Sequence, residues 1–358
     1  MSDPLKLSVY FGESDRVAGR LLSDCLFDEF EHRGLHAAIL LRAVEGFGIK
    51  QALRTDRFLS LSEDLPLLAI AVDDGRRIEA ALPRVMELVA GGLVTLERAE
   101  LLRDRLDTVT LPGELEDATK LTVYLGRDDR VGRRPAFLEV VTQLELHGLA
   151  GATVFLGVDG MAHGERRRAR FFSRNARVPL MVVSVGPGEA VSRVLPVLGE
   201  LLDDPIVTLE RVRVCKRDGE LLREPSQLPE RDEAGLGLWQ KLTVYAGEQA
   251  RHAGHPLSVE LVHRLRAAGA GGATSIRGIW GFSGDHPPHG DRLFAVERRV
   301  PVVTSVVDTP ERIQRWFRIV DACTDEAGLV TSELVPAFRA TAPDARIGGL
   351  KLAQLTPG

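Results

Sequence analysis

The stretch Lys6-Leu7-Ser8-Val9-Tyr10-Phe11-Gly12 occurs three times in this chain of 358 residues. It returns as Lys120-Leu121-Thr122-Val123-Tyr124-Leu125-Gly126 and as Lys241-Leu242-Thr243-Val244-Tyr245-Ala246-Gly247. Other landmarks keep the same spacing: a glycine follows each lysine by 28 residues (Gly34, Gly148, Gly269) and another by 40 residues (Gly46, Gly160, Gly281). A fixed period of this kind is the signature of internal repetition. The sequence therefore predicts three copies of one unit.

Each copy has the pattern of six secondary-structure elements. In the first, apolar runs at residues 5–11, 37–44, 67–72 and 93–96 are typical of short strands. Apolar residues recur at helical spacing over residues 20–33 and from Ile78 to Val89. The order βαββαβ is that of a ferredoxin-like unit. We therefore predict an α+β fold with three tandem ferredoxin-like domains, at residues 5–102, 119–215 and 239–340.

The second and third strands of a unit are apolar on both faces. Leu67-Leu68-Ala69-Ile70-Ala71-Val72 shows no alternation with polar residues. A sheet with helices on one face only would alternate, because its other face would meet water. The remaining face must therefore be covered, and the sheets of the sister units are the available cover. Identical units usually close around a symmetry axis, so we expect an intramolecular pseudo-trimer that needs no second chain.

Composition excludes several classes of protein. The net charge of −5 provides no basic field for nucleic acid. Three widely separated cysteines give no disulfide framework, which favours a reducing compartment. Apolar runs are far shorter than a membrane span, and residues 1–6 lack the pattern of a signal peptide. We expect a soluble, cytoplasmic protein. Residues 103–119 and 216–238 are interpreted as solvated linkers, and the tail after Arg339 as partly loose.

Three motifs of the first unit resemble a known family. Gly12-Glu13-Ser14-Asp15, Arg42-Ala43-Val44-Glu45-Gly46-Phe47-Gly48 and Leu61-Ser62-Glu63-Asp64-Leu65-Pro66 are similar to the PII-like (GlnB-like) domain-of-unknown-function family numbered 190. The resemblance weakens in the third unit (Trp280-Gly281-Phe282-Ser283) and most in the second (Asp159-Gly160-Met161-Ala162). It implies trimers of the ferredoxin-like fold that bind small effectors, often adenine nucleotides, in clefts between subunits. It also implies signal transduction through a T-loop after the second strand, whose partner is often a membrane transporter or channel.

One feature departs from the PII pattern. PII proteins hold nucleotide phosphates on a loop with Gly and Lys between the second helix and fourth strand. Here that connection is reduced to Gly91-Gly92, Asp203-Asp204-Pro205 or Asp325-Glu326-Ala327-Gly328. These turns contain no lysine, and two of the three are acidic, which repels phosphate. An adenine nucleotide thus remains the candidate ligand, but three equal ATP sites are not expected.

The candidate effector-binding residues are taken from the loop base and the second strand: Arg42, Gly46, Phe47, Gly48, Arg277 and Gly281. Glycines there could offer backbone N–H groups to an anion, or could simply be required by the backbone. Arg42 and Arg277, at equivalent positions, could bind a ligand or pair with a carboxylate such as Glu63. Glu13-Ser14-Asp15 is interpreted as the cap of the first helix.

The partner-facing segments would be the loops at residues 46–57, 160–178 and 281–298. The second carries Glu165-Arg166-Arg167-Arg168-Ala169-Arg170, either a solvated basic loop or a docking element for an acidic partner or lipid headgroups. The third carries His286-Pro287-Pro288-His289, whose spacing is no known metal signature; no metal site is predicted. No nucleophile–base or paired-carboxylate arrangement recurs in the units. We therefore expect a non-enzymatic regulator that binds a small anionic or nucleotide effector, with a ligand-free adaptor or a metal-handling protein like the trimeric copper-tolerance proteins as alternatives.

Overall fold

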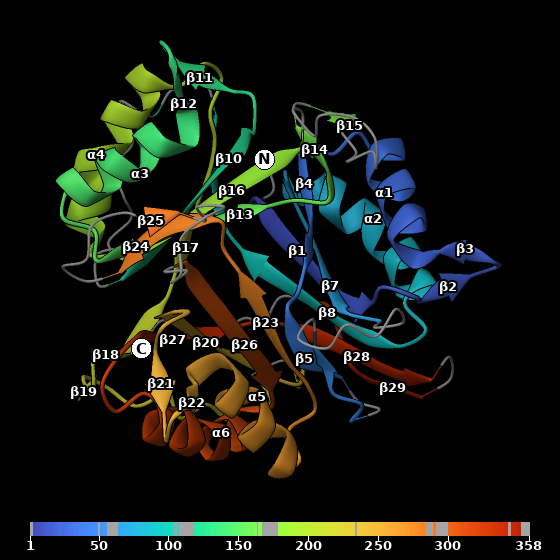
Figure 1. Cartoon of the computed structure of the whole chain (residues 1–358). Coiled ribbons are helices and arrows are strands. Elements are labelled where there is room, and N and C mark those ends of the chain that lie inside the picture. Colours follow the sequence, from blue (N-terminus) through green and yellow to red (C-terminus); the bar gives the residue numbers. More distant parts are fainter. Residues whose placement is uncertain are drawn as a thin grey trace.

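The computed structural model describes residues 3–48, 51–55, 64–103, 106, 118–162, 164–166, 178–232, 235–283, 289–290, 300–342 and 345–351. Three lobes surround a common centre, each with two helices on the outside and a sheet on the inside (Figure 1). The lobes correspond to the three sequence units. The fold is therefore α+β, with each helix pair covering the outer face of its own sheet.

The first unit contains four long strands and two helices. Its sheet has the order β4-β7-β1-β8, and all neighbours are antiparallel. The elements are β1 (Leu5–Gly12), β2 (Arg16–Val17), β3 (Arg20–Leu21), α1 (Leu22–His32), β4 (Ala37–Arg42), β5 (Glu45–Phe47), β6 (Arg54–Thr55), β7 (Pro66–Asp73), α2 (Gly75–Leu88), β8 (Gly92–Arg98) and β9 (Glu100–Leu102).

The second and third units repeat this series with the same strand order. The second contains β10 (Thr119–Gly126), β11 (Arg130–Val131), β12 (Arg134–Pro135), α3 (Ala136–Leu146), β13 (Gly151–Leu156), β14 (Asp159–Ala162), β15 (Glu165–Arg166), β16 (Pro179–Gly186), α4 (Gly188–Leu201), β17 (Ile206–Arg211), β18 (Arg213–Arg217) and β19 (Glu220–Leu221). The third contains β20 (Gln240–Gly247), β21 (Arg251–His252), β22 (His255–Pro256), α5 (Leu257–Ala267), β23 (Ala273–Arg277), β24 (Trp280–Ser283), β25 (His289–Gly290), β26 (Pro301–Asp308), α6 (Pro310–Cys323), β27 (Leu329–Leu334), β28 (Ala337–Ala342) and β29 (Ala345–Gly348).

Successive side chains of the first strand point alternately towards the helices and towards the centre of the molecule. Leu5, Leu7 and Val9 are buried against α1 and α2. Lys6 and Ser8, which alternate with them, point to the opposite face because successive strand residues face opposite ways, and both are buried. The inner faces of the three sheets meet in one apolar cluster that includes Ile39, Phe155 and Ile276, one from each unit. The doubly apolar strands thus have the second covering layer that their sequence predicts.

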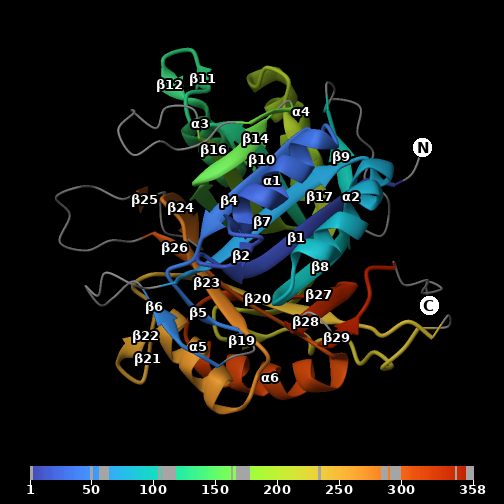
Figure 2. The same ribbon diagram turned by 90° about the vertical axis from the view of Figure 1, so that its right-hand side faces the viewer.

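The short strand after the second long strand of each unit crosses to a neighbouring unit. β5 pairs with β23 of the third unit, β24 with β13 of the second, and β14 with β4 of the first. A second set of strands runs the other way round: β9 pairs with β17, β18 with β27, and β28 with β8. Every unit therefore gives a crossing strand to each of the other two units and receives one from each. Figure 2 shows one of these crossings, with β5 beside β23.

The second set of crossing strands corrects two predictions about connections. The second predicted linker, residues 216–238, begins inside β18, which pairs with β27 of the third unit, so its first residues are built into a neighbouring sheet. The tail after Arg339 was expected to be partly loose, yet β28 and β29 form a hairpin whose first strand joins β8. β9 has only three residues and β29 four, and β18 carries three basic residues among its five, so they show little of the hydrophobic periodicity by which strands are recognised.

The start of the first helix is a further correction. Glu13-Ser14-Asp15 does not cap α1, because the β2–β3 hairpin lies between them and the N-cap residue Leu21 makes no side-chain cap bond. Asp15 instead accepts a hydrogen bond from the Gly12 N–H at 2.8 Å, closing the turn after β1. Within the described residues, no helix is long and apolar enough to cross a membrane.

Candidate functional site

The glycine of each loop base lies where a strand crosses to the neighbouring unit. Gly46 is opposite Thr274, Gly160 opposite Ile39, and Gly281 opposite Thr153. A Cβ atom at Gly46 would lie 2.6 Å from the carbonyl oxygen of Ala273, and the equivalent distances at Gly160 and Gly281 are 2.5 and 2.1 Å. Such contacts are forbidden to real side chains, so close backbone approach between units explains the glycine.

The residue after each of these glycines is an apolar anchor. Phe47 is buried in the core of the third unit, Phe282 in that of the second, and Met161 in that of the first. Each anchor thus fills the core of a neighbouring unit. Burial of a Phe or Met side chain is worth about 1.5–3 kcal/mol. The motif Gly46-Phe47 consequently joins units, a role that the sequence pattern alone did not indicate.

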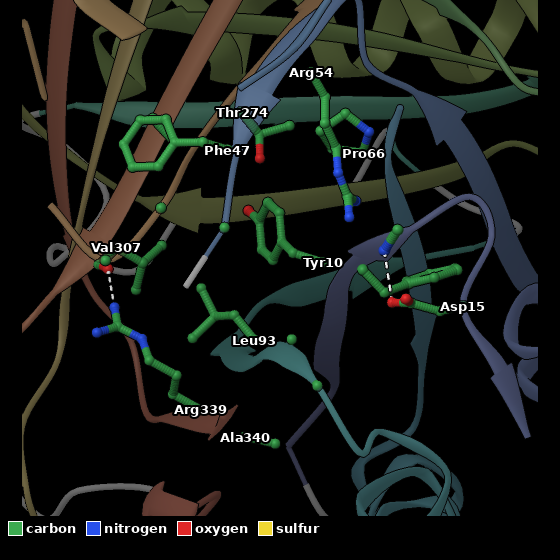
Figure 3. Close-up of a pocket in the computed structure, with 18 of the residues that line it drawn as sticks. Tyr10, Asp15, Phe47, Arg54, Pro66, Leu93, Thr274, Val307, Arg339 and Ala340 are labelled. Carbon is green, nitrogen blue, oxygen red and sulfur yellow. Dashed lines mark hydrogen bonds between the residues drawn. The ribbon is translucent and has the colours of Figure 1, made fainter. Parts of the chain in front are cut away.

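A cleft opens beside this junction, between the first and third units. Its volume is about 150 Å³. Figure 3 shows Tyr10 near its middle, with Phe47 and Thr274 on one side and Leu93 on the other. Gly48 also lines the cleft, and a Cβ atom there would meet nothing within 4 Å. An engineered apolar cavity of similar volume in another protein holds a benzene ring, so the cleft can accept one ring-sized group.

Two arginines stand at different edges of the cleft (Figure 3). Arg339, from β28, donates to the Val307 carbonyl at 2.8 Å, lies 3.5 Å from Asp308 and stacks on Trp239. Burial lowers the pKa of Arg339, although Asp308 opposes that shift. Arg54, from β6, pairs with Asp64 at 2.7 Å. Both guanidinium groups are therefore held in place at the edges of the cleft.

The size of one residue explains why the clefts differ. Gly271 lines the 150 Å³ cleft, and a Cβ atom there would lie only 2.4 Å from the Arg339 guanidinium. The equivalent residue of the second unit is Ala150, which lines a smaller cavity of about 50 Å³ against the third unit. In the first unit the position holds His36, whose ring bonds Asp73 at 3.0 Å. The cleft between the first and third units, which Gly271 lines, is thus larger than the cavity between the second and third units.

The turn between α2 and β8 forms one wall of the same cleft. Gly91 and Gly92 both line it, and Gly92 has a φ of +143°, which favours glycine. A Cβ atom at Gly92 would lie 2.4 Å from the Tyr10 carbonyl oxygen. As expected from the sequence, this turn brings no lysine to the cleft, so the charges available to an anion come from Arg54 and Arg339.

The two second-strand arginines do not line this cleft. Arg42 pairs with Glu13 at 2.9 Å, and Arg277 lies 3.4 Å from Glu248, which is the equivalent residue of the third unit. Two roles were open for these arginines, ligand binding or pairing with a carboxylate, and the structure shows a carboxylate partner for each. That partner is Glu13 for Arg42, whereas Glu63 lies outside the described residues. The candidate residues thus divide: Phe47 and Gly48 line the cleft, Gly46 and Gly281 make the strand crossings, and Arg42 and Arg277 are paired elsewhere.

At the molecular centre, a ring of buried charges joins all three units. Lys6, Lys120 and Lys241 alternate with Glu97, Glu210 and Glu333. Each lysine bonds the glutamate opposite it in its own sheet and one from the next unit, at N–O distances from 2.5 to 3.2 Å. Burial alone would raise the pKa of Glu97, but Lys241, Lys6 and Lys120 hold it well below its ordinary value.

The three glutamates of the ring are close enough to share a metal ion, since one oxygen from each lies within 4.8 Å of the others. Three ammonium groups bonded to the same carboxylates oppose a further cation there. In the sequence, Lys6, Lys120 and Lys241 mark the start of each repeat, and no charge pairing is predicted for them. The glutamate at the end of each fourth strand, recurring in the same register, was the signal that could have predicted the ring.

The predicted partner-facing loops are described only in part. Arg166 is not a free docking residue: it bonds Asp28 at 2.7 Å and Asp159 at 2.9 Å and stacks on Phe27 of the first unit. The other arginines of that loop, at residues 167, 168, 170, 174 and 177, lie outside the described residues, as does His286. Their predicted roles stay predictions.

Comparison with known proteins identifies three matches to one family model. The model, DUF190 (Uncharacterized ACR), matches residues 4–101, 118–214 and 239–337. A UPF0166 protein of Aquifex aeolicus is 27% identical over 99 residues, which are 27% of this chain and 90% of that protein. A UPF0166 protein of Methanocaldococcus jannaschii is 26% identical over 91 residues, 25% of this chain and 83% of that protein. One unit of this chain thus corresponds to most of either relative.

Proposed function

Because this chain belongs to the DUF190 family and carries three copies of its domain, we propose that it is a PII-like regulatory protein built as an intramolecular pseudo-trimer of ferredoxin-like units. It binds a small effector in the cleft between the first and third units. The cyclic exchange of strands supports the pseudo-trimer. The strand order β4-β7-β1-β8 supports the ferredoxin-like unit, since it places the two helical crossovers on one face.

The observation that carries the proposal is the position of the cleft. Its lining includes Phe47 and Gly48 at the loop base, together with Arg339 and Ala340 from the strand that the third unit gives to β8. A ligand there would touch both crossing strands and the segment that leads into residues 49–57. Ligand and loop conformation would then be coupled, because a ligand shifts a population only through contacts that differ between states.

The lining defines the class of effector. Aromatic and aliphatic side chains make most of the walls, and two guanidinium groups stand at the rim. A flat ring with an attached anionic group satisfies both features. The volume of about 150 Å³ holds the ring, and the anionic group would meet Arg54 or Arg339. An adenine mononucleotide has this form, whereas a triphosphate would lack the lysine-bearing loop that PII proteins provide.

A protein partner would recognise whether the effector is bound, and the chain itself would catalyse no reaction. The three loops at residues 46–57, 160–178 and 281–298 differ in sequence, so each would present a different surface. By resemblance to PII-like proteins, a membrane transporter or channel is the partner class proposed. Loops on a rigid scaffold commonly carry such recognition.

A thermal-shift panel tests the proposal, with AMP, ADP, ATP, cyclic AMP and bicarbonate as ligands. A ligand present at 100 times its Kd adds about 2.7 kcal/mol to the free energy of unfolding. Gly48→Leu places a side chain in the cleft without a clash, because the space beyond Gly48 is open. Gly237→Leu, at another open glycine outside the cleft, is the matched control.

The expected result is a rise in Tm for at least one nucleotide, which Gly48→Leu abolishes and Gly237→Leu preserves. A shift that survives in Gly48→Leu places the ligand elsewhere and contradicts the proposed site. The absence of any shift contradicts the effector class and leaves the ligand-free adaptor as the better description.

A further inference from the structure

Arg103, Arg217 and Arg339 occupy equivalent positions in the three units, and only Arg103 and Arg339 have an aspartate partner there. Arg103 directly follows β9, Arg217 ends β18 and Arg339 lies within β28. Arg339 pairs with Leu93 at the start of a neighbour's fourth strand, and Arg217 pairs with the equivalent Leu329. Arg103 bonds Asp73 at 2.9 Å, and Arg339 lies 3.5 Å from Asp308. The aspartate is the last residue of the third long strand in both units.

In the second unit that aspartate is replaced by Gly186, the last residue of β16. No ion pair or side-chain hydrogen bond of Arg217 occurs within the described ranges. Its Nε atom is buried without a partner, as is that of Arg103, but Arg103 binds Asp73 through another guanidinium nitrogen. A buried donor without a partner costs about 1–3 kcal/mol, more when charged. Arg217 therefore has an unmet need for an acceptor where its two counterparts have a carboxylate.

Space for such an acceptor exists beside Arg217. It lines a vestibule of about 1,090 Å³ that Gly186 and Pro187 also line. Four further arginines line the vestibule, namely Arg98, Arg211, Arg213 and Arg223, against two acidic residues outside the central ring, Asp3 and Glu100. The volume is at the upper end of the range for small-molecule sites, roughly 300–1,000 Å³.

The central ring does not cancel this charge. Glu97, Glu210 and Glu333 line the vestibule, but each is bonded to buried lysines. Arg217 is opposite Leu329, four residues before Glu333 on β27, a separation of about 13 Å along a strand. Glu220 is opposite Arg217 on β19, but it is exposed and does not line the vestibule. Outside the ring the lining has five arginines and two acidic residues, so the group that fits beside Arg217 is an oxyanion of the kind that a guanidinium binds with paired N–H donors.

We propose that Arg217 anchors a second ligand site, which takes the carboxylate or phosphate group of a small molecule in place of the aspartate that Gly186 replaces. This site is independent of the cleft between the first and third units, since none of Gly186, Arg217 and Arg223 lines that cleft. The ligand of the Arg217 site need not be a nucleotide. If no anion binds at Arg217, the proposed effector site between the first and third units is unaffected.

Gly186 allows a sharp test, because aspartate there restores the pair present in the other units. A Cβ atom at Gly186 would approach only the Leu149 side chain, at 3.3 Å, so the substitution needs a small adjustment. Gly186→Asn adds the same volume without the charge and serves as the matched control. Isothermal titration with sodium phosphate, and separately with sodium citrate, at constant ionic strength distinguishes a phosphate from a carboxylate ligand.

The wild type is expected to bind at least one of the two anions with a Kd below about 1 mM. Gly186→Asp should weaken that binding at least about tenfold, as loss of a charged hydrogen bond does, while Gly186→Asn changes it less than about threefold. Arg217→Gln should match Gly186→Asp. Absence of binding by the wild type, equal binding by Gly186→Asp, or equal loss in Gly186→Asp and Gly186→Asn would each overturn the proposal.

Discussion

Lys120 of the second unit lies 2.6 Å from Glu333 of the third, and both side chains are buried at the centre of the molecule. The same relationship joins Lys241 to Glu97 and Lys6 to Glu210. Each of these contacts links two units, and a glutamate of a misplaced unit would leave a lysine unpaired. Buried ion pairs specify geometry more reliably than they add stability. The ring is therefore interpreted as the element that fixes how the three units meet.

Removal of one member of the ring should destabilise the whole chain. Lys120→Met leaves Glu210 and Glu333 with one buried partner fewer, and breaking a buried pair from one side costs about 3–5 kcal/mol. The control is Arg193→Ala, which removes an exposed pair with Glu189 and should cost less than about 1 kcal/mol. Urea unfolding followed by circular dichroism measures both. A loss of similar size in the two variants would contradict the structural role of the ring.

The pH dependence of stability follows from the direction of the pKa shifts. The pKa of Glu97 in the folded chain is depressed below its ordinary 4.5, because the attraction of three lysines outweighs burial. Its contribution is therefore present above about pH 4.5 and is lost as pH falls towards the folded value. The pKa of Lys120 is raised above 10.5, because Glu210, Glu333 and Glu97 outweigh burial. Its contribution is present below pH 10.5 and is lost as pH rises beyond it.

The free energy of unfolding should consequently form a plateau between about pH 4.5 and pH 10.5, and fall on both sides. Urea titrations across this range measure the plateau. In Lys120→Met the decline above pH 10.5 should become shallower, because the Lys120 ammonium group, whose pKa is raised in the folded chain, is gone. An unchanged alkaline decline in this variant would show that other groups cause it.

Close approach at the strand crossings should make their glycines intolerant of any side chain. Gly46→Ala brings a methyl group to 2.6 Å from the Ala273 carbonyl oxygen, so β5 must move away from β23. We expect a cost of about 1–3 kcal/mol, typical of overpacking. Gly237→Ala, in open space, should cost less than about 0.5 kcal/mol. Hydrogen exchange at β5 and β23 should increase in the first variant only; protection equal to that of the wild type would argue against the crossing as described.

The cleft between the first and third units should close when Gly271 gains a side chain. A methyl group there would lie 2.4 Å from the Arg339 guanidinium and must displace it. Gly271→Ala should therefore weaken binding of the effector found in the thermal-shift panel by at least about tenfold. Ala150→Gly, the matched change in the cavity between the second and third units, should leave that affinity unchanged. Equal affinities of Gly271→Ala and wild type would move the site away from Arg339.

The repeat and its elements could be predicted from sequence because they rest on local patterns. The lysine-led strand, the helix-ending glycine and the doubly apolar third strand each recur in register, and the family model matches three times. The crossing strands could not be predicted in the same way. Residues 100–102 and 337–342 become strands because a neighbour's edge is beside them, and that edge is far away in sequence.

The candidate site was predictable in part for a similar reason. Phe47 and Gly48 were chosen from the loop motif and do line the cleft. Arg339 carries no such motif: it lies nearly 300 residues from the loop base, immediately before the tail that is predicted to be partly loose. Its partner Asp308 ends a strand in the same position as Asp73, and the glycine at position 186 breaks that series. Comparison between the three units, residue by residue, is the signal that would have found these arginines.

The proposed pseudo-trimer requires that one chain supplies all three units of the assembly. The mass of the chain in solution, measured by light scattering across a hundredfold range of concentration, tests it directly. The strand exchange closes within one chain, so the predicted mass is that of a single chain, 39.1 kDa, at every concentration. A stable trimer of chains, or a mass that rises with concentration because β5 or β28 pairs with another molecule, would contradict it.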